Sequence, residues 1–478
     1  MKKFLSLVLA LVMTMSLVTV SAGAKDFTDD SEITYKEAVD VISALGVVDG
    51  YSDGDFRPDD VLTRGAAAKI ICNLILGPTT ASALSAGTAP FKDVPVTNTF
   101  AGYITYCSQQ GIISGYADGT FRPTGTLSGN AFMKMLLGAL GYDSSIEGYT
   151  GANWQVSVIK QASGIGLDDG NDEFVGSKAV TRQEAALYAF NMLQSTMVEY
   201  DAKTTVDVNG ATVTIAGDKA KEVSNGAANE TIKDDNKMQF GEKYFDKLTL
   251  NDDGSDAFAR PSNVWRFKGE KVGTYAKTPD ATYSSNVELG DIYKDLELSE
   301  KDTADVYING LKGDDVVVSK ANEVKIASDS GNKDKVGTGS TVEVFYDEDH
   351  NDVTICVIDN YVGTVSKTVE AKGNADRYVV IANESDTSIA NYNNEYETEE
   401  TFADDAVVIF TYSASEKEIQ SVAVAESAAG TMTRKEDNKT TGKKVTLADT
   451  AYSVAKNVGY DGFTFDSMTV DSEYTAYL

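Results

Sequence analysis

The sequence is poor in the residue types on which most catalytic and metal sites depend. Its 478 residues contain one histidine, His350, and three cysteines. One histidine excludes zinc sites built from several histidines and leaves a single candidate for any histidine-dependent triad. His350 lies in an acidic stretch, and no Gly-x-Ser-x-Gly nucleophile motif accompanies it. We therefore expect a surface histidine in a protein with no catalytic centre, no metal site and no cofactor.

Basic residues are also scarce. The chain has 42 lysines and arginines against 73 aspartates and glutamates, a net charge of −31. Such a surface repels nucleic acid and anionic membranes, so we expect neither as a partner. It is compatible with cation binding or with solubility at a crowded cell surface. Because acids are so abundant, no single carboxylate pair is informative, and glycosidase-type chemistry stays open.

Long apolar runs are absent beyond the N-terminus. Residues 4–20 are almost wholly apolar, follow Lys2 and Lys3, and precede the small residues 22–24. This pattern predicts a secretory signal peptide over residues 1–24, cleaved after Ala24. No later stretch approaches the ~20 apolar residues of a membrane span. We therefore expect an exported protein that leaves the membrane once the signal is removed.

The cysteines, Cys72, Cys107 and Cys356, are too few and too scattered for a disulfide framework. Cys72 and Cys107 lie among apolar residues of helical segments, so we expect buried thiols rather than a bridge. An exported protein without disulfides is more typical of a bacterium than of a eukaryotic extracellular space.

What the sequence does contain is an internal repeat. Residues 50–58 read Gly-Tyr-Ser-Asp-Gly-Asp-Phe-Arg-Pro, and residues 115–123 match them at seven of nine positions. Asp-Gly tolerates positive φ, the phenylalanine can turn inward, and the proline fixes the departing chain. Each copy is therefore expected to be a turn between two helices. We interpret the turn arginines, Arg57 and Arg122, as structural.

Helical periodicity flanks both turns and recurs a third time. The three segments cover residues 25–80, 88–142 and 149–197. In the third segment, residues 166–170 stand in for the turn, and the Phe-Arg-Pro end is missing. Two short helices cannot bury their apolar faces alone, so we expect the three segments to pack against one another.

The second helix of each segment begins at a residue suited to capping. Thr63 and Ser128 are expected caps, and Thr181 forms a capping box with Glu184, in which each residue bonds the backbone of the other.

The plan of these segments resembles the S-layer homology domain. It comprises an opening Phe-x-Asp, a helix, the Gly-Tyr-x-Asp-Gly-x-Phe-Arg-Pro turn, and a Thr-Arg-x-Glu helix start. The resemblance covers residues 25–197 and implies three repeats arranged as a pseudo-threefold spindle. Such triplets attach exported bacterial proteins non-covalently to secondary cell-wall polysaccharide, often carrying a pyruvylated amino sugar. The resemblance also implies a location in the wall or surface layer of a Gram-positive bacterium. Self-association into a surface lattice is compatible with that location.

The resemblance further predicts where the polysaccharide binds. In the family, grooves between neighbouring repeats use an arginine of an Ile-Thr-Arg-Ala-Glu motif, with aromatic and glycine residues nearby. This arginine maps onto Arg64 and Arg182, whereas Gly129 occupies the position in the second segment, whose groove is expected to bind weakly. A guanidinium fork matches a carboxylate such as a pyruvyl ketal, and a helix start favours anions. The expected ligand residues are Arg64, Arg182, Trp154, Thr63, Thr181, Tyr51 and Tyr116.

Plain alternatives stay open for three of these residues. Arg64 and Arg182 also suit solvated positions at a helix start, and Trp154 suits core packing as well as ligand stacking. The first segment departs from the family motif as well, because Ala66 replaces its glutamate.

After residue 197, helical spacing gives way to alternation. Short strands are expected at 206–208, 213–215, 247–250, 264–267 and 272–275, and a hairpin at 342–346 with 353–357. Residues 407–424 echo that hairpin. We expect a multi-domain α + β protein, an all-α triplet followed by small all-β modules. The modules are assigned to residues 198–330, 331–400 and 401–478.

Three details of this tail carry expectations of their own. Residues 256–275 resemble the tails that follow S-layer homology triplets in anaerobic Gram-positive bacteria. Residues 251–256 resemble a calcium loop but lack its bidentate glutamate, so a solvated turn is expected. Residues 470–478 alternate like a strand with no partner following, which is typical of an incomplete module in a fragment.

The function that these patterns favour is anchoring of an exported surface protein to wall polysaccharide, with a structural or binding tail. A wall-anchored polysaccharide hydrolase and a carbohydrate-binding adhesin remain the alternatives. A hydrolase would need a deep cleft with convergent carboxylates.

Overall fold

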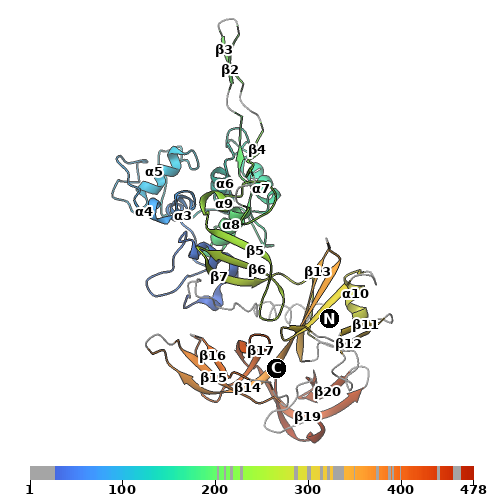
Figure 1. Cartoon of the computed structure of the whole chain (residues 1–478). Coiled ribbons are helices and arrows are strands. Elements are labelled where there is room, and N and C mark those ends of the chain that lie inside the picture. The colour runs from blue at the N-terminus through green and yellow to red at the C-terminus, as the bar shows by residue number, and fades with distance from the viewer. Residues whose placement is uncertain are drawn as a thin grey trace. The chain divides into compact units, whose positions relative to one another are not determined.

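The structure is a computed structural model. The residues that it describes are 27–201, 204–208, 211–215, 219–226, 230–284, 289–298, 303–312, 316–319, 323–326, 339–348, 350–372, 376–385, 389, 392–398, 400–438, 442–455 and 465–478. The predicted signal peptide lies outside them. The chain divides into a helical body, residues 27–251 with 264–273, and a β-rich body, residues 252–263 with 274–478. The expected α + β class is confirmed in this form (Figure 1).

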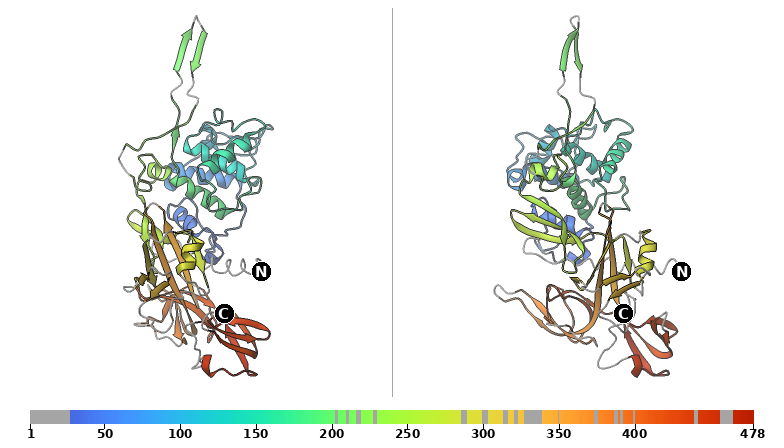
Figure 2. Two further views of the ribbon diagram at one scale, coloured as in Figure 1. Left: turned by 90° about the vertical axis from the view of Figure 1, so that its right-hand side faces the viewer. Right: turned by 45° about the vertical axis from the view of Figure 1, so that its right-hand side comes forward.

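Seven α-helices gather in the first part of the helical body, coloured blue to green in Figure 2. A short 3-10 helix, η1 (Asp30–Glu32), precedes them. The apolar stripe predicted for the first helix is confirmed, since Ala38, Val39 and Ile42 are buried. The helices are α2 (Lys36–Ala44), α3 (Arg64–Leu76), α4 (Pro78–Ser82), α5 (Ala101–Gln109), α6 (Gly129–Leu140), α7 (Trp154–Gly164) and α8 (Arg182–Gln194).

The two repeated turns have the same geometry. The amide of Tyr51 donates to the carbonyl of Asp55 at 2.8 Å, and that of Tyr116 donates to Thr120 at 2.7 Å. The glycine of each Asp-Gly pair has positive φ, 96° in Gly54, as the turn prediction required. The phenylalanines of both turns, Phe56 and Phe121, are buried.

An aspartate at the opening of each of these two segments holds its own turn in place. The carboxylate of Asp29 accepts from the amides of Phe56 and Arg57, at 2.7 and 2.6 Å. Asp93 accepts from the corresponding residues of its segment. The opening phenylalanine packs there too, because the Phe27 and Phe56 ring centroids are 5.2 Å apart. The phenylalanine and the aspartate of the Phe-x-Asp opening therefore hold the turn against the start of the segment.

The three segments meet in a closed ring of backbone hydrogen bonds. The amide of Leu62 donates to the carbonyl of Val180 at 2.8 Å. The amide of Val180 donates to Leu127 at 2.9 Å, and that of Leu127 donates back to Leu62 at 3.1 Å. These residues directly precede the caps of α3, α6 and α8, and all three are buried. The ring therefore brings the three helix starts together.

The turn of the third segment differs from the alignment made on its sequence. Gly166 ends α7 with a φ of 75°, and the amide of Leu167 reaches back to Ala162 at 2.9 Å. Gly46 ends α2 in the same way, so residue 166 matches the helix-ending glycine and not the first turn glycine. Phe174 precedes the cap Thr181 by seven residues, the spacing of Phe56 and Thr63. The phenylalanine expected to be missing is therefore present, and the turn is two residues shorter.

The predicted caps and thiols are confirmed. Thr63 accepts from the amide of Ala66, and Thr181 forms the capping box with Glu184; Ser128 caps α6. Cys72 and Cys107 are free and buried between α3 and α5, with their Sγ atoms 3.5 Å apart.

Residues 198–251, assigned from sequence to the tail, belong to the helical body. The predicted strands at 206–208 and 213–215 are confirmed as an antiparallel pair, β2 with β3. The elements are β1 (Val198–Glu199), β2 (Thr204–Val208), β3 (Ala211–Ile215), β4 (Lys221–Glu222) and α9 (Phe240–Tyr244). The chain then passes between the two bodies through β5 (Leu248–Ser255), β6 (Pro261–Phe267) and β7 (Glu270–Ala276), which form one sheet in that order.

Trp265 on β6 packs against the helices of the first and third segments. Its indole Nε1 donates to the Glu37 carboxylate of α2 at 2.6 Å. Its ring lies 5.3 Å from that of Phe190 on α8, in an edge-on contact. Trp265 is fully buried, so this strand completes the core of the helical body.

The candidate calcium loop is not a loop. Residues 251–255 continue strand β5, and neither the calcium loop nor the solvated turn expected from the sequence is present. Asp256 instead pairs with buried Arg260, Oδ2 to Nε at 2.6 Å. The carboxylate of Asp256 therefore takes part in a buried ion pair of the fold.

The β-rich body is built around one long strand, β14. The predicted hairpin is confirmed, because β13 pairs antiparallel with the first half of β14. The second half pairs with β15 on one side and β17 on the other. The expected boundary between residues 400 and 401 thus falls within a single sheet. The predicted echo at 407–424 is the antiparallel pair of β17 and β18.

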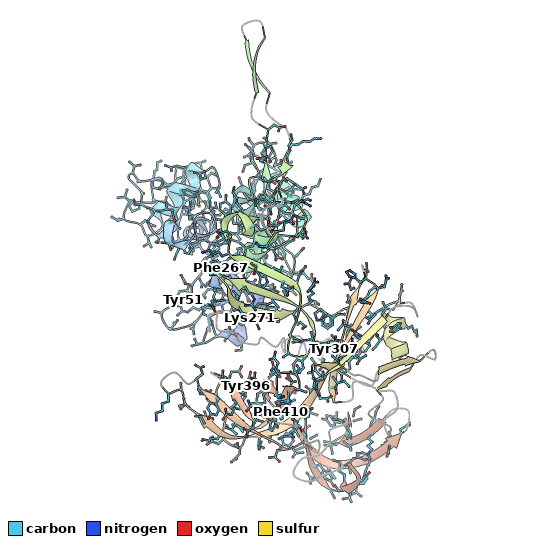
Figure 3. All side chains as sticks on the ribbon, viewed as in Figure 1. Tyr51, Phe267, Lys271, Tyr307, Tyr396 and Phe410 are labelled. Carbon is cyan, nitrogen blue, oxygen red and sulfur yellow. The ribbon has the colours of Figure 1, made fainter. Side chains whose placement is uncertain are left out.

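Separate hydrophobic cores cover the two halves of β14. Phe410 and Tyr396, labelled in Figure 3, belong to the second of these cores. The last predicted strand is confirmed as β22, which pairs with β19. The elements are β8 (Ala281–Tyr283), α10 (Leu289–Asp295), β9 (Thr303–Ile308), β10 (Leu311–Lys312), β11 (Val316–Ser319), β12 (Glu323–Ile326), β13 (Ser340–Asp347), β14 (Asp352–Val369), β15 (Tyr378–Asn383), β16 (Glu395–Glu397), β17 (Val407–Ser413), β18 (Glu418–Val424), β19 (Ser427–Asn438), β20 (Gly442–Leu447), β21 (Thr450–Ser453), η2 (Phe465–Ser467) and β22 (Glu473–Tyr477).

Among the described residues, no helix combines the length and the apolar character needed to cross a membrane.

Candidate ligand site at the helix starts

Arg182, the first residue of α8, extends from the third segment into the turn of the first. Its Nε donates to the carbonyl of Phe56 at 2.8 Å, and Nη2 donates to the carbonyl of Asp49 at 2.9 Å. The guanidinium carbon lies 4.8 Å from the ring centroid of Tyr51, which is one of the residues labelled in Figure 3. Tyr51 is 42% exposed, so the cluster borders solvent. The first residue of one helix thus carries a cation to the turn of the next segment.

Arg64, the first residue of α3, repeats this arrangement one segment further on. Its Nε donates to Phe121 at 2.8 Å, and Nη2 donates to Ser114 at 3.2 Å. Tyr116 lies 5.0 Å from the guanidinium carbon and is 43% exposed. The structure therefore brings four of the predicted site residues together as two matching pairs, Arg182 with Tyr51 and Arg64 with Tyr116.

The turn arginines belong to the same clusters, although the sequence suggested only a structural role. The guanidinium carbon of Arg57 lies 4.1 Å from the ring centroid of Tyr51, and that of Arg122 lies 4.2 Å from the ring centroid of Tyr116. Each turn arginine is paired with the aspartate four residues earlier, Arg57 with Asp53 and Arg122 with Asp118. Their positive charge is therefore largely balanced within the turn.

The Asp118 carboxylate shows this balance in its titration. The hydroxyl and amide of Thr120, together with the guanidinium of Arg122, lower the pKa of Asp118 to about 2. The carboxylate therefore stays ionised across the physiological range and keeps Arg122 paired.

The helix-start arginines differ, because neither has a carboxylate partner among the described residues. Burial lowers the pKa of both Arg64 and Arg182, so both guanidinium groups have lost part of their hydration. The acceptors of their hydrogen bonds are neutral backbone carbonyls. A partly dehydrated cation without a counterion favours binding of an anion. The arginines that do pair with a carboxylate are Arg57, Arg122, Arg260, Arg377 and Arg434.

The other predicted site residues have different surroundings. The side chains of Thr63 and Thr181 serve as helix caps and thereby set the position of the arginine that follows each of them. Trp154 begins α7 and is partly buried. Its basic neighbour is Lys134 of α6, whose Nζ lies 5.4 Å from the ring centroid, and not one of the arginines.

The second segment has no helix-start arginine, and its backbone leaves little room for a side chain. A Cβ added to Gly129 would lie 2.9 Å from Cε2 of Phe174 and 3.1 Å from Cα of Gly176. The third segment also places Asn171, not a tyrosine, after Gly170. Both partners of the cluster are thus replaced at this boundary.

Sequence reasoning missed the groups that receive the arginines. These are backbone carbonyls, which have no sequence signature, yet the acceptors Asp49 and Ser114 lie 65 residues apart, the same offset as the two turns. That offset could have indicated that both arginines reach equivalent places.

Metal-binding groups are not assembled in the part of the chain that the structure describes. No cluster of three or more histidine, cysteine, aspartate or glutamate side chains there could hold a metal ion. His350 is exposed, as expected, and its Nδ1 lies 2.8 Å from Asp347.

A family model for the S-layer homology domain matches residues 26–68 and 90–129. The N-terminal region carries S-layer homology domains. The matched stretches contain both repeated turns, both Phe-x-Asp openings and Arg64. The resemblance recognised in the sequence is therefore confirmed for the first two segments.

The relatives of this chain include surface and anchoring proteins. A surface layer protein of Brevibacillus choshinensis is 29% identical over 172 residues, 36% of this chain and 15% of that protein. A cellulosome-anchoring protein of Acetivibrio thermocellus is 32% identical over 111 residues, 23% of this chain and 25% of that protein. An endoglucanase of a Bacillus species is 32% identical over 105 residues, 21% of this chain and 11% of that enzyme.

The chain spans between 11% and 25% of the length of these curated relatives. The S-layer homology match and the surface-layer and anchoring relatives indicate a protein of the cell surface. The match to the endoglucanase covers a small part of that enzyme, as the other two matches cover small parts of those proteins.

Proposed function

We propose that the helical body anchors this exported protein to an acidic secondary cell-wall polysaccharide, and that Arg64 and Arg182 hold its carboxylate groups. The observation that carries the proposal is the state of these two guanidinium groups. They are partly dehydrated, lack a carboxylate partner within the described chain, and lie beside exposed tyrosine rings. A pyruvyl ketal on a wall sugar would supply the missing carboxylate.

We also infer that residues 149–197 form a third S-layer homology repeat and that the three repeats make a pseudo-threefold triplet. The ring of hydrogen bonds through Leu62, Val180 and Leu127 supports this inference, because each segment donates once and accepts once. The common seven-residue spacing from the turn phenylalanine to the cap supports it as well. The β-rich body then has a structural or binding role at the cell surface.

The test is sedimentation of the purified full-length protein with cell walls of the host. Arg64→Ala and Arg182→Ala should each weaken association by one to two decades, since a lost charge-assisted hydrogen bond costs about 1.5–3 kcal/mol. The double variant should lose most of the association. Arg266→Ala is the matched control, because this arginine of the helical body is exposed and, within the described residues, its guanidinium bonds the carbonyl of Gly269. Unchanged sedimentation of a folded double variant would contradict the proposal.

A further inference from the structure

Two cysteine side chains meet at the boundary between the first and second segments. Cys72 lies on α3 and Cys107 on α5, both are fully buried, and their Sγ atoms are 3.5 Å apart. The remaining cysteine, Cys356, lies in the β-rich body. One segment boundary of the helical body therefore holds a pair of thiols in contact, and the other boundaries hold none.

Each thiol contacts the opposite helix in the same way. The Cys72 thiol donates to the carbonyl of Tyr103 on α5, and the Cys107 thiol donates to the carbonyl of Ala68 on α3, both at 3.6 Å. Each of these carbonyls belongs to the residue four positions before the cysteine of its own helix. The arrangement is therefore reciprocal, and it holds both sulfurs at the point where the two helices meet.

A disulfide at this boundary requires little movement. Its S–S bond is about 2.05 Å long, so the two sulfurs have to approach by about 1.5 Å, or roughly 0.7 Å each. Small rotations of the two side chains cover a distance of this size. At a separation of 3.5 Å no other atom fits between the sulfurs, so nothing has to be displaced.

We propose that Cys72 and Cys107 form an oxidation site, at which an external disulfide is reduced and the first and second segments become covalently joined. One cysteine, as its thiolate, attacks a sulfur of the external disulfide and releases the other half as a thiol. The second cysteine then displaces the attached half. Two S–H bonds break and one S–S bond forms, and the two protons and two electrons convert the external disulfide into two thiols. Exported proteins meet such oxidants, whereas the cytosol keeps thiols reduced.

The bond should form while the chain folds. The hydrogen bond with Cys72, together with burial, raises the pKa of the Cys107 thiol, so this residue supplies little thiolate in the folded protein. We therefore expect fast oxidation during refolding and slow oxidation of the folded protein. The inference does not depend on the anchoring proposal, because neither cysteine is among the residues proposed to hold the polysaccharide.

Refolding of the full-length protein from urea tests the site. The probe is oxidised glutathione, with dithiothreitol in the parallel sample. Trypsin cleaves after Lys92, the one lysine or arginine between the two cysteines, so the bond would join two peptides that separate on reduction. We expect mass spectrometry to detect this linked pair in the oxidised sample. Absence of the linked pair, glutathione adducts in its place, or a link through Cys356 would overturn the proposal.

Thermal melts followed by circular dichroism measure what the bond does to the fold. The bond joins residues 35 positions apart in the sequence, so the oxidised protein should melt about 5–10 °C above the reduced protein. Cys72→Ala should melt at one temperature after either treatment. Cys356→Ala is the matched control and should keep the difference. If a cysteine variant fails to fold, the linked peptides of the parent protein still decide. An oxidised parent that melts at or below the reduced parent would show that the fold does not accommodate the bond and would refute the inference.

Discussion

The carboxylate of Asp93 accepts a 2.7 Å hydrogen bond from the amide of Phe121, 28 residues further along the chain. It also accepts from the amide of Arg122 at 2.7 Å, and Asp29 holds the first turn in the same way. These bonds fix the backbone whose carbonyls receive the helix-start arginines. The aspartate of the Phe-x-Asp opening thus supports the candidate site without being part of it.

Replacing Asp93 should therefore destabilise the helical body. Asp93→Ala leaves two amides without their acceptor, and we expect a loss of roughly 1–3 kcal/mol in the free energy of unfolding. Asp118→Ala is the matched control at the exposed side of the same turn and should cost less. Urea denaturation followed by circular dichroism measures both. Equal losses in the free energy of unfolding for the two variants would contradict the role of Asp93 in holding the turn.

Acid should weaken the same turn. Although partial burial opposes it, hydrogen bonding from the amides of Phe121 and Arg122 lowers the pKa of Asp93 below its usual value. A carboxylate whose pKa is lower in the folded state stabilises the fold above its unfolded pKa of about 4, and this contribution is lost as the pH falls further. The pKa of Asp118 is about 2, so the stabilisation from its carboxylate is lost only as the pH falls toward that value. Thermal melts between pH 7 and pH 2 should show the midpoint falling below pH 4, and less steeply in Asp93→Asn.

Restoring the family arginine in the second segment should not restore a site. A Cβ at residue 129 would meet the ring of Phe174 and the backbone of Gly176, so Gly129→Arg requires the third segment to shift. We expect a destabilisation of roughly 1–3 kcal/mol and no gain in wall association. Gly129→Ala should show most of the same loss. Tighter association of a stable Gly129→Arg protein would show that the boundary can accept the motif after all.

Trp265 should stabilise the helical body although it lies on β6, far along the sequence from α2 and α8, the helices that it contacts. Trp265→Phe removes the hydrogen bond to Glu37 and part of a fully buried ring, which we expect to cost roughly 1–3 kcal/mol. Trp154→Phe, at a partly exposed position, should cost much less. A truncation that ends at residue 197 should likewise unfold more easily than one that keeps residues 198–276. Equal melting temperatures for the two truncations would refute this.

The sequence predicted the local features well because each depends on neighbouring residues. Helix periodicity, the capping box at Thr181 and the Asp-Gly turns are all of this kind. It did not predict which groups meet across the fold, such as the carbonyl that receives Arg182 or the docking of Trp265, since a partner distant in sequence leaves no local pattern. The third turn was misaligned because it was counted from Gly166 and not from the spacing between Phe174 and its cap. The strand at residues 251–255 was missed because its aspartates and glycine favour turns in isolation.

The most direct test of the account is a titration of the full-length protein with host wall polysaccharide before and after removal of its acidic groups. Because we propose that the partly dehydrated guanidinium groups of Arg64 and Arg182 bind the carboxylates of the polymer, we expect isothermal titration calorimetry to show at least tenfold weaker binding of the neutral polymer. The difference between the two polymers should largely disappear in the Arg64→Ala/Arg182→Ala protein. Equal affinity of the parent protein for the acidic and the neutral polymer would contradict the central claim.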